Sequence, residues 1–107
     1  MSNLEQSVAQ VRDGSSFYWG FYAPDERQGG YEPVEVRLNA SPEALEKIVP
    51  PAGWAIDRVQ WGDMLFLRRR QLLVRDDVEE MLVEMLRFAA ANGLQLHSWL
   101  HGADIDP

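Results

Sequence analysis

The order of hydrophobic patterns between residues 34 and 101 constrains the fold of this chain more than any other feature of its sequence. Patterns typical of β-strands cover 34–39, 54–61, 64–70 and 94–101. Patterns typical of amphipathic helices, with apolar residues three and four positions apart, cover 42–49 and 77–92. The sequence therefore predicts the order strand, helix, strand, strand, helix, strand.

Capping and turn residues support the boundaries of these elements. Ser41 followed by Pro42 is typical of a helix start. Asp76, with Glu79 three residues later, forms a candidate capping box for the second helix. Gly62–Asp63 separates the second and third strands and predicts a type II′ hairpin turn.

This order of elements is that of the ferredoxin-like βαββαβ sandwich, an α+β fold. Both βαβ crossovers are expected to be right-handed, so both helices lie on the same side of an antiparallel sheet. The length of 107 residues is that of a single domain, in which 34–101 forms the core and 102–107 an acidic tail.

The first 33 residues add elements to this core. Ser2 and Glu5 predict a capped helix that ends at Gly14. The aromatic side chains of residues 16–22 alternate, which predicts an extra strand at an edge of the sheet, with both faces at least partly covered. A loop over 23–33, rich in proline, glycine and charge, is expected to be the most mobile segment.

The formal net charge of -7 is unevenly distributed along the chain. Residues 54–75 carry a local charge of +3, which leaves -10 for the remainder. This balance argues against broad binding to nucleic acids or anionic lipids, and no apolar run is long enough to span a membrane. The absence of cysteine and of a secretion leader leads us to expect a cytoplasmic protein without disulfides.

No residue pattern indicates catalysis, a metal or a cofactor. His97 and His101 would lie about 13 Å apart on a strand, too far to share a metal. Asp104 and Asp106 could add oxygen ligands only from the tail. The helix dipole and capping explain the carboxylates that open the second helix, namely Asp76, Asp77, Glu79, Glu80 and Glu84. An enzyme is therefore the least favoured class of protein.

Two sets of residues are candidates for binding. The first combines aromatic and acidic side chains of the kind found at protein interfaces, namely Tyr18, Tyr22, Tyr31, Trp99, Glu80 and Glu84. The second consists of arginines suited to an anion, namely Arg58, Arg68, Arg69 and Arg70. An RNA recognition motif is not favoured, because the third core strand has one aromatic residue and no glycine.

Part of the C-terminal half resembles a known family. The segments Gly62–Leu67, Asp77–Asn92 and Gly93–Trp99 are similar in layout to the regulator of ribonuclease E activity B family. The resemblance implies a small acidic ferredoxin-like protein that inhibits an RNA-processing endonuclease by binding it. This chain has His97–Ser98–Trp99 where that family tends to have Tyr-Asp-Gly-Trp, so no contact residue is transferred from the family.

The leading hypothesis is a non-catalytic protein that binds and regulates or inhibits another protein, such as a nuclease or toxin with a basic surface. An immunity-type or phage-encoded inhibitor fits the same description. The alternative from another class is a small-molecule or anion-binding module that uses the sheet face around Arg58, Arg69 and Trp61. The sequence leaves open whether the chain forms a homodimer and which of its aromatic residues are exposed.

Overall fold

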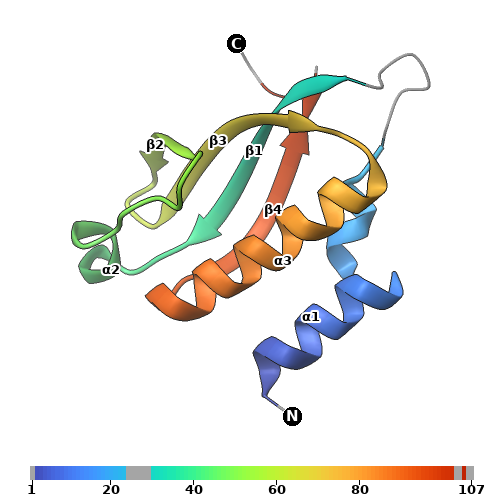
Figure 1. Cartoon of the computed structure of the whole chain (residues 1–107). Coiled ribbons are helices and arrows are strands. Elements are labelled where there is room, and N and C mark those ends of the chain that lie inside the picture. The colour runs from blue at the N-terminus through green and yellow to red at the C-terminus, as the bar shows by residue number, and fades with distance from the viewer. Residues whose placement is uncertain (1, 24–29, 103–104, 106–107) are drawn as a thin grey trace.

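Four strands form one antiparallel sheet in the order β2-β3-β1-β4. The computed structural model describes residues 2–23, 30–102 and 105. The strands are β1 (Tyr31–Asn39), β2 (Ala55–Gln60), β3 (Met64–Leu72) and β4 (Gln95–His101). With helices in both crossovers, this is the predicted α+β fold of the ferredoxin-like type (Figure 1).

The core lies between the sheet and α3 (Arg75–Asn92). The central strand β1 contributes Val34, Val36 and Leu38, which are completely buried, as their alternation with polar residues predicts. They form one cluster with apolar residues of β3 and α3, namely Leu65, Leu67, Val78, Met81, Leu82 and Met85. Burial of each such side chain stabilises the fold by about 1.5–3 kcal/mol relative to exposure.

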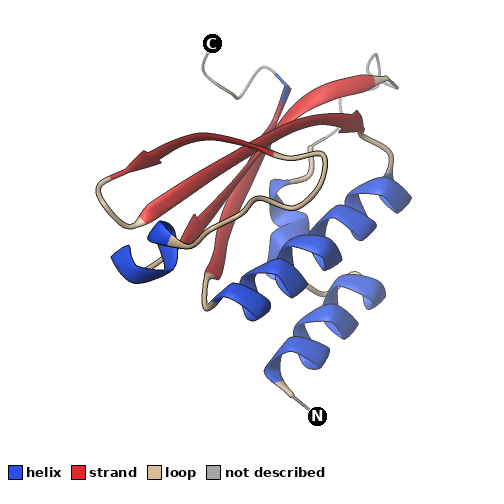
Figure 2. Ribbon diagram, turned by 60° about the vertical axis from the view of Figure 1, so that its left-hand side comes forward, coloured by secondary structure: helices blue, strands red, loops and turns tan. Residues whose placement is uncertain are grey.

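Helix α1 (Asn3–Asp13) packs beside α3, in the same layer of the fold (Figure 2). The Ser2 hydroxyl accepts a hydrogen bond from the Glu5 backbone N–H, and Gly14 ends the helix with φ 85°, as predicted. Arg12 donates to the carboxylates of Glu79 and Glu80 on α3. These ion pairs tie the N-terminal helix to the core.

Helix α2 (Pro42–Glu46) is shorter than the predicted range 42–49. The Ser41 hydroxyl accepts from the Ala44 N–H, which confirms the predicted start, but Val49 is 74% exposed instead of buried. Trp54, in the segment after α2, is buried in the core cluster. The short helix lies at one end of the sheet (Figure 1) and leaves apolar side chains of β2 partly exposed.

The aromatic segment does not form the predicted extra strand. It forms η1 (Phe17–Phe21), a 3₁₀ helix, and the sheet has no fifth strand among the described residues. Its polar side-chain atoms bind backbone carbonyl groups instead of extending a ladder: Tyr18 donates to Leu96, and Trp19 donates to Val11. In a 3₁₀ helix, residues three positions apart share a side, so a run of aromatic residues also suits this structure.

Two predicted boundaries are corrected by the structure. The β2–β3 turn is centred on Trp61 and Gly62, with φ of 56° and 76°, instead of on Gly62–Asp63. Positive φ at both central residues is the pattern of a type I′ turn, not of the predicted type II′ turn. Helix α3 begins at Arg75, and Asp76 lies in its first turn instead of at its N-cap.

The predicted loop 23–33 and the tail 102–107 are described only in part. Residues 31–33 belong to β1, whereas residues 24–29, which include Gly29, lie outside the described part of the chain, as do Asp104 and Asp106.

Candidate functional site

The sheet face opposite the helices carries a cluster of charged and aromatic side chains. Strand alternation turns Glu35 and Arg37 of β1 away from the core, because Val34, Val36 and Leu38 point into it. The register places Arg68 of β3 opposite Glu35 and Phe66 opposite Arg37. Arg58 of β2 lies opposite Phe66 on its other side. We call Glu35, Arg37, Asp57, Arg58, Phe66 and Arg68 the open-face cluster.

Glu35 is at the centre of the open-face cluster and is only 1% exposed. Arg37 donates to its Oε2 from Nε and Nη2 at 3.0 and 2.9 Å. Arg68 donates to its Oε1 from Nε and Nη2 at 2.9 and 2.8 Å. Because both carboxylate oxygens are occupied by guanidinium groups, Glu35 fixes the arginines in place and presents no oxygen to a ligand.

Phe66 is buried although it lies on the face that none of the described helices covers. The guanidinium groups of Arg37 and Arg58 lie over its ring, 4.7 and 4.3 Å from the centroid. The indole of Trp61 meets the same ring edge-on at a centroid distance of 6.2 Å. The outer surface of the cluster is therefore made of planar cationic and aromatic groups.

Trp61 lies beside the open-face cluster and is largely exposed. It is 77% exposed, and its φ of 56° is a conformation that a bulky residue adopts at a cost of about 1–3 kcal/mol. Non-glycine residues held in such conformations cluster at functional sites. The hairpin thus presents an indole ring to solvent beside the arginines.

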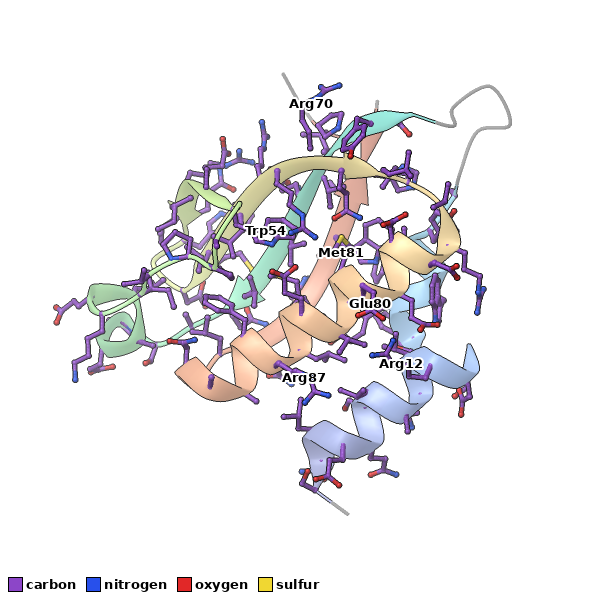
Figure 3. The ribbon with its side chains drawn as sticks, viewed as in Figure 1. Arg12, Trp54, Arg70, Glu80, Met81 and Arg87 are labelled. Carbon is purple, nitrogen blue, oxygen red and sulfur yellow. The ribbon has the colours of Figure 1, made fainter. Side chains whose placement is uncertain are left out.

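Two further arginine groups shape the open face. The Nε of Arg58 is buried and has no hydrogen-bond partner among the described residues, so it presents no donor to solvent. Arg70 extends the face toward the start of β1, where it donates to the Tyr31 carbonyl, and it is exposed (Figure 3). Arg37, Arg58, Arg68 and Arg70, with Glu35 and Asp57, give this face a local formal charge of +2.

Arg69 does not belong to this surface. The prediction that Arg58, Arg69 and Trp61 share one face of the sheet is therefore wrong for Arg69. The side chain of Arg69 points to the helix layer, where it pairs with Glu84 at 3.1 Å. Its guanidinium lies 4.3 Å from the centroid of a Trp54 ring. Arg68 and Arg70 share the opposite face, as strand alternation predicts.

Three aromatic candidates for partner binding are built into the fold. Trp99 is completely buried and donates from its indole N–H to the Tyr18 carbonyl. Tyr18 and Tyr22 are partly buried, and their hydroxyls donate to the Leu96 and Leu73 carbonyls. Burial raises the pKa of both tyrosine hydroxyls above the ordinary value. The contacts of these three residues explain them as parts of the core.

The other three candidates do not converge on one surface. Tyr31 is largely exposed at the start of β1, on the open-face side by strand alternation. Glu80 is exposed on α3 and accepts from Arg12, as Figure 3 shows. Glu84, on the same helix, pairs with Arg69 of β3. The predicted aromatic and acidic surface is therefore not assembled as one patch.

The histidines and the grooves show no acid–base constellation. His97 is exposed beside the Ser98 hydroxyl, whereas His101 is buried and accepts from the Ala23 N–H. No group of three or more metal-ligating side chains occurs in the described part of the chain. A shallow groove of about 260 Å³ between α1, α3 and β4 is lined by no acidic, basic or histidine side chain.

Sequence reasoning did not select Arg37, Glu35 or Phe66. The signal was present for two of them, because Glu35 and Arg37 alternate with the three apolar residues of β1 and so belong on one wet face. Phe66 could not be assigned from its neighbours, since Leu65 and Leu67 beside it are equally apolar. Only the pairing of β1 with β3 brings the three residues together.

Within residues 2–23, 30–102 and 105, no helix combines the length and apolarity needed to cross a membrane. The resemblance to the regulator of ribonuclease E activity B family remains a prediction. Neither a family model nor a curated protein matches this chain.

Proposed function

We propose that this chain is a non-catalytic protein that regulates another protein by binding an acidic segment of it against the open face of the sheet. The observation that carries the proposal is the convergence of Arg37 and Arg58 over Phe66, with Trp61 exposed beside the ring. Arg68 lies on the same face, where it is held by Glu35. Guanidinium groups bind carboxylates in a planar, bidentate manner, and Trp and Arg dominate binding energy at protein interfaces.

The charge distribution favours a local contact over general attraction to anions. The chain as a whole carries -7, so long-range forces repel acidic partners, while the open face carries +2. A partner must therefore place its carboxylates directly on the arginines, which makes the contact selective. The sequence predicted a partner with a basic surface. The proposal takes an acidic partner instead, because the acidic candidates Glu80 and Glu84 do not form one patch with the aromatic candidates, whereas the arginines of the open face lie together.

The proposal assigns no catalytic residue. Glu35 uses both carboxylate oxygens to hold arginines, and Asp57 pairs with Arg58. Inhibition by binding, which the resemblance to the ribonuclease E regulator family implies, needs only a surface of this kind. The small-anion alternative uses the same arginines and is separated from the protein-segment proposal by experiment.

The test is binding of a fluorescently labelled peptide rich in Asp and Glu, followed by anisotropy, with a peptide of Asn and Gln at the same positions as the reference. Arg58→Gln with Arg70→Gln removes two charges of the face, and we expect affinity to fall about tenfold. Arg87→Gln is the matched control, because Arg87 is an exposed arginine of α3 on the helix side (Figure 3).

Equal loss of affinity in the control, or binding of the neutral peptide at the same strength, would contradict the proposal. Inorganic phosphate is the probe for the alternative. If phosphate raises the melting temperature of the chain and the acidic peptide does not bind, the open face is a small-anion site.

A further inference from the structure

The two edges of the sheet are not equivalent. At the β4 edge, η1 lies against the strand, and the Tyr18 hydroxyl donates to the Leu96 carbonyl. At the other edge, β2 forms its ladder with β3 alone, and apart from the turn contact of the Asp63 N–H with the Gln60 carbonyl, no other described segment bonds to it through the backbone. The outer side of β2 is therefore available for pairing with another strand.

A bulge gives β2 an apolar face at this edge. The register with β3 shifts between Ile56 and Arg58, so Ile56 lies opposite Leu67 and Val59 lies opposite Leu65. Leu65 and Leu67 share the core side of β3, so Ile56 and Val59 both lie on the helix side of the sheet. They are 42% and 46% exposed.

The sequence of β2 is complementary to itself in antiparallel pairing. With a two-fold axis between Asp57 and Arg58, each Ile56 lies opposite a Val59, and each Asp57 lies opposite an Arg58. Opposite charges and apolar pairs directly across two strands are favourable, and a two-fold axis uses every such pair twice. We propose that β2 pairs with β2 of a second copy of this chain.

Such a dimer would have one continuous sheet of eight strands. The open faces of both copies would lie on the same side of this sheet, with the two Arg58 side chains near the axis. The inference does not rest on the proposed binding of acidic segments, since the apolar pairs lie on the opposite side of the sheet. It needs only the free edge and its register.

Bulges and charged residues also protect edge strands of monomeric proteins from pairing, so the experiment must separate the two cases. Sedimentation equilibrium of the full chain is expected to give twice the chain mass of 12.2 kDa at high concentration. Val59→Lys is expected to weaken the dimer by about tenfold or more, because it places a charge opposite Ile56. Val49→Lys is the matched control, since Val49 is an equally replaceable, exposed valine outside the strand.

Charge exchange tests the register itself. Asp57→Arg and Arg58→Asp each place like charges opposite one another, so each variant alone is expected to be monomeric. An equimolar mixture of the two restores opposite charges at every pair and is expected to give a heterodimer. Far-UV circular dichroism confirms that both variants fold. Val59→Lys tests the dimer independently, through the apolar pair and without changing the charged cluster.

Three results would overturn the proposal: a monomer at every concentration, a dimer that Val59→Lys does not weaken, or charge variants that dimerise alone as well as in the mixture. None of these results bears on peptide binding, which is read by anisotropy. Failure of the dimer and failure of the proposed function are therefore distinguishable.

Discussion

Replacing Glu35 by glutamine is the sharpest test of how the open face is held together. The substitution keeps the shape of the side chain and removes the negative charge that two guanidinium groups share. One amide oxygen remains to accept hydrogen bonds, while the amide nitrogen turns a donor toward an arginine. Either Arg37 or Arg68 therefore loses its acceptor at a side chain, that of residue 35, which is only 1% exposed.

The magnitude follows from two limits. Removing one partner of a fully buried ion pair costs about 3–5 kcal/mol, and each hydrogen bond to a charged group contributes about 1.5–3 kcal/mol. The side chains of Arg37 and Arg68 are 29% and 28% exposed, so water can replace part of the lost interaction. We therefore expect a loss of about 2–3 kcal/mol in the free energy of unfolding, or about 10–20 °C in melting temperature.

Urea unfolding followed by far-UV circular dichroism measures this loss, with an unchanged slope indicating that the native state stays compact. Glu80→Gln is the matched control, because Glu80 is exposed and pairs with Arg12 at the surface, where such a pair contributes less than about 1 kcal/mol. If the two variants lose the same small amount, Glu35 does not hold the arginines as argued. The open face would then be an ordinary solvated surface.

Two further predictions address the turn and the aromatic cluster. Trp61→Asn introduces the residue favoured before glycine in a type I′ turn. We expect a gain of about 0.5–1 kcal/mol in the free energy of unfolding, measured by thermal melting, and weaker binding of the acidic peptide, measured by anisotropy. A variant that loses stability would show that the packing of Trp61 on Phe66 outweighs its strained φ of 56°. Burial raises the pKa of Tyr18 above its ordinary value near 10, so the folded state holds the hydroxyl proton more tightly than the unfolded state does. The stability that this difference contributes is complete below a pH of about 10 and is lost as the pH rises through the raised pKa. Urea unfolding between pH 9 and 11, in steps of about half a unit, is expected to show a fall in stability that Tyr18→Phe reduces, with the remainder assigned to Tyr22, whose pKa is also raised by burial; an identical fall in the variant would contradict this assignment.

Periodic patterns predicted the elements that bury one face. The apolar residues that the alternation in β1 and the three-four spacing in α3 select are buried, because each element presents an apolar side to one core. The patterns do not predict the burial of Val83 on α3 or of Glu35 on the face of β1 expected to be wet. The order of these elements is that of the ferredoxin-like fold, and the observed strand order β2-β3-β1-β4 is consistent with it.

The prediction of a strand for the aromatic segment is wrong for a physical reason. Five aromatic residues within 17–22 satisfy a period of two and a period of three equally well, so periodicity cannot choose between a strand and a 3₁₀ helix. In the structure, the Tyr18 hydroxyl donates to the Leu96 carbonyl and the Trp19 indole N–H donates to the Val11 carbonyl, and neither partner can be identified from the aromatic segment alone. The same limit applies to α2, whose apolar Val49 lies beyond the helix end.

The candidate site could be predicted in part. Strand alternation correctly separated Arg69 from Arg68 and Arg70, but it could not show which other strand lies beside them. Glu35 and Arg37 are over thirty positions away from Arg68 in the chain and become its neighbours only through the β1–β3 register. A site made from three strands is visible from the sequence only after their order and register are known.

The central position of β1 has a consequence for how the chain acquires its structure during synthesis. Both neighbours of β1, namely β3 and β4, follow it in the sequence. Helix α1 packs on α3, which lies in the C-terminal third of the chain. A ribosome therefore releases the N-terminal half before any of the surfaces that cover it exist. Pairings between distant segments fold slowly and expose apolar strands meanwhile, so we expect this domain to form its core only after β4 has emerged.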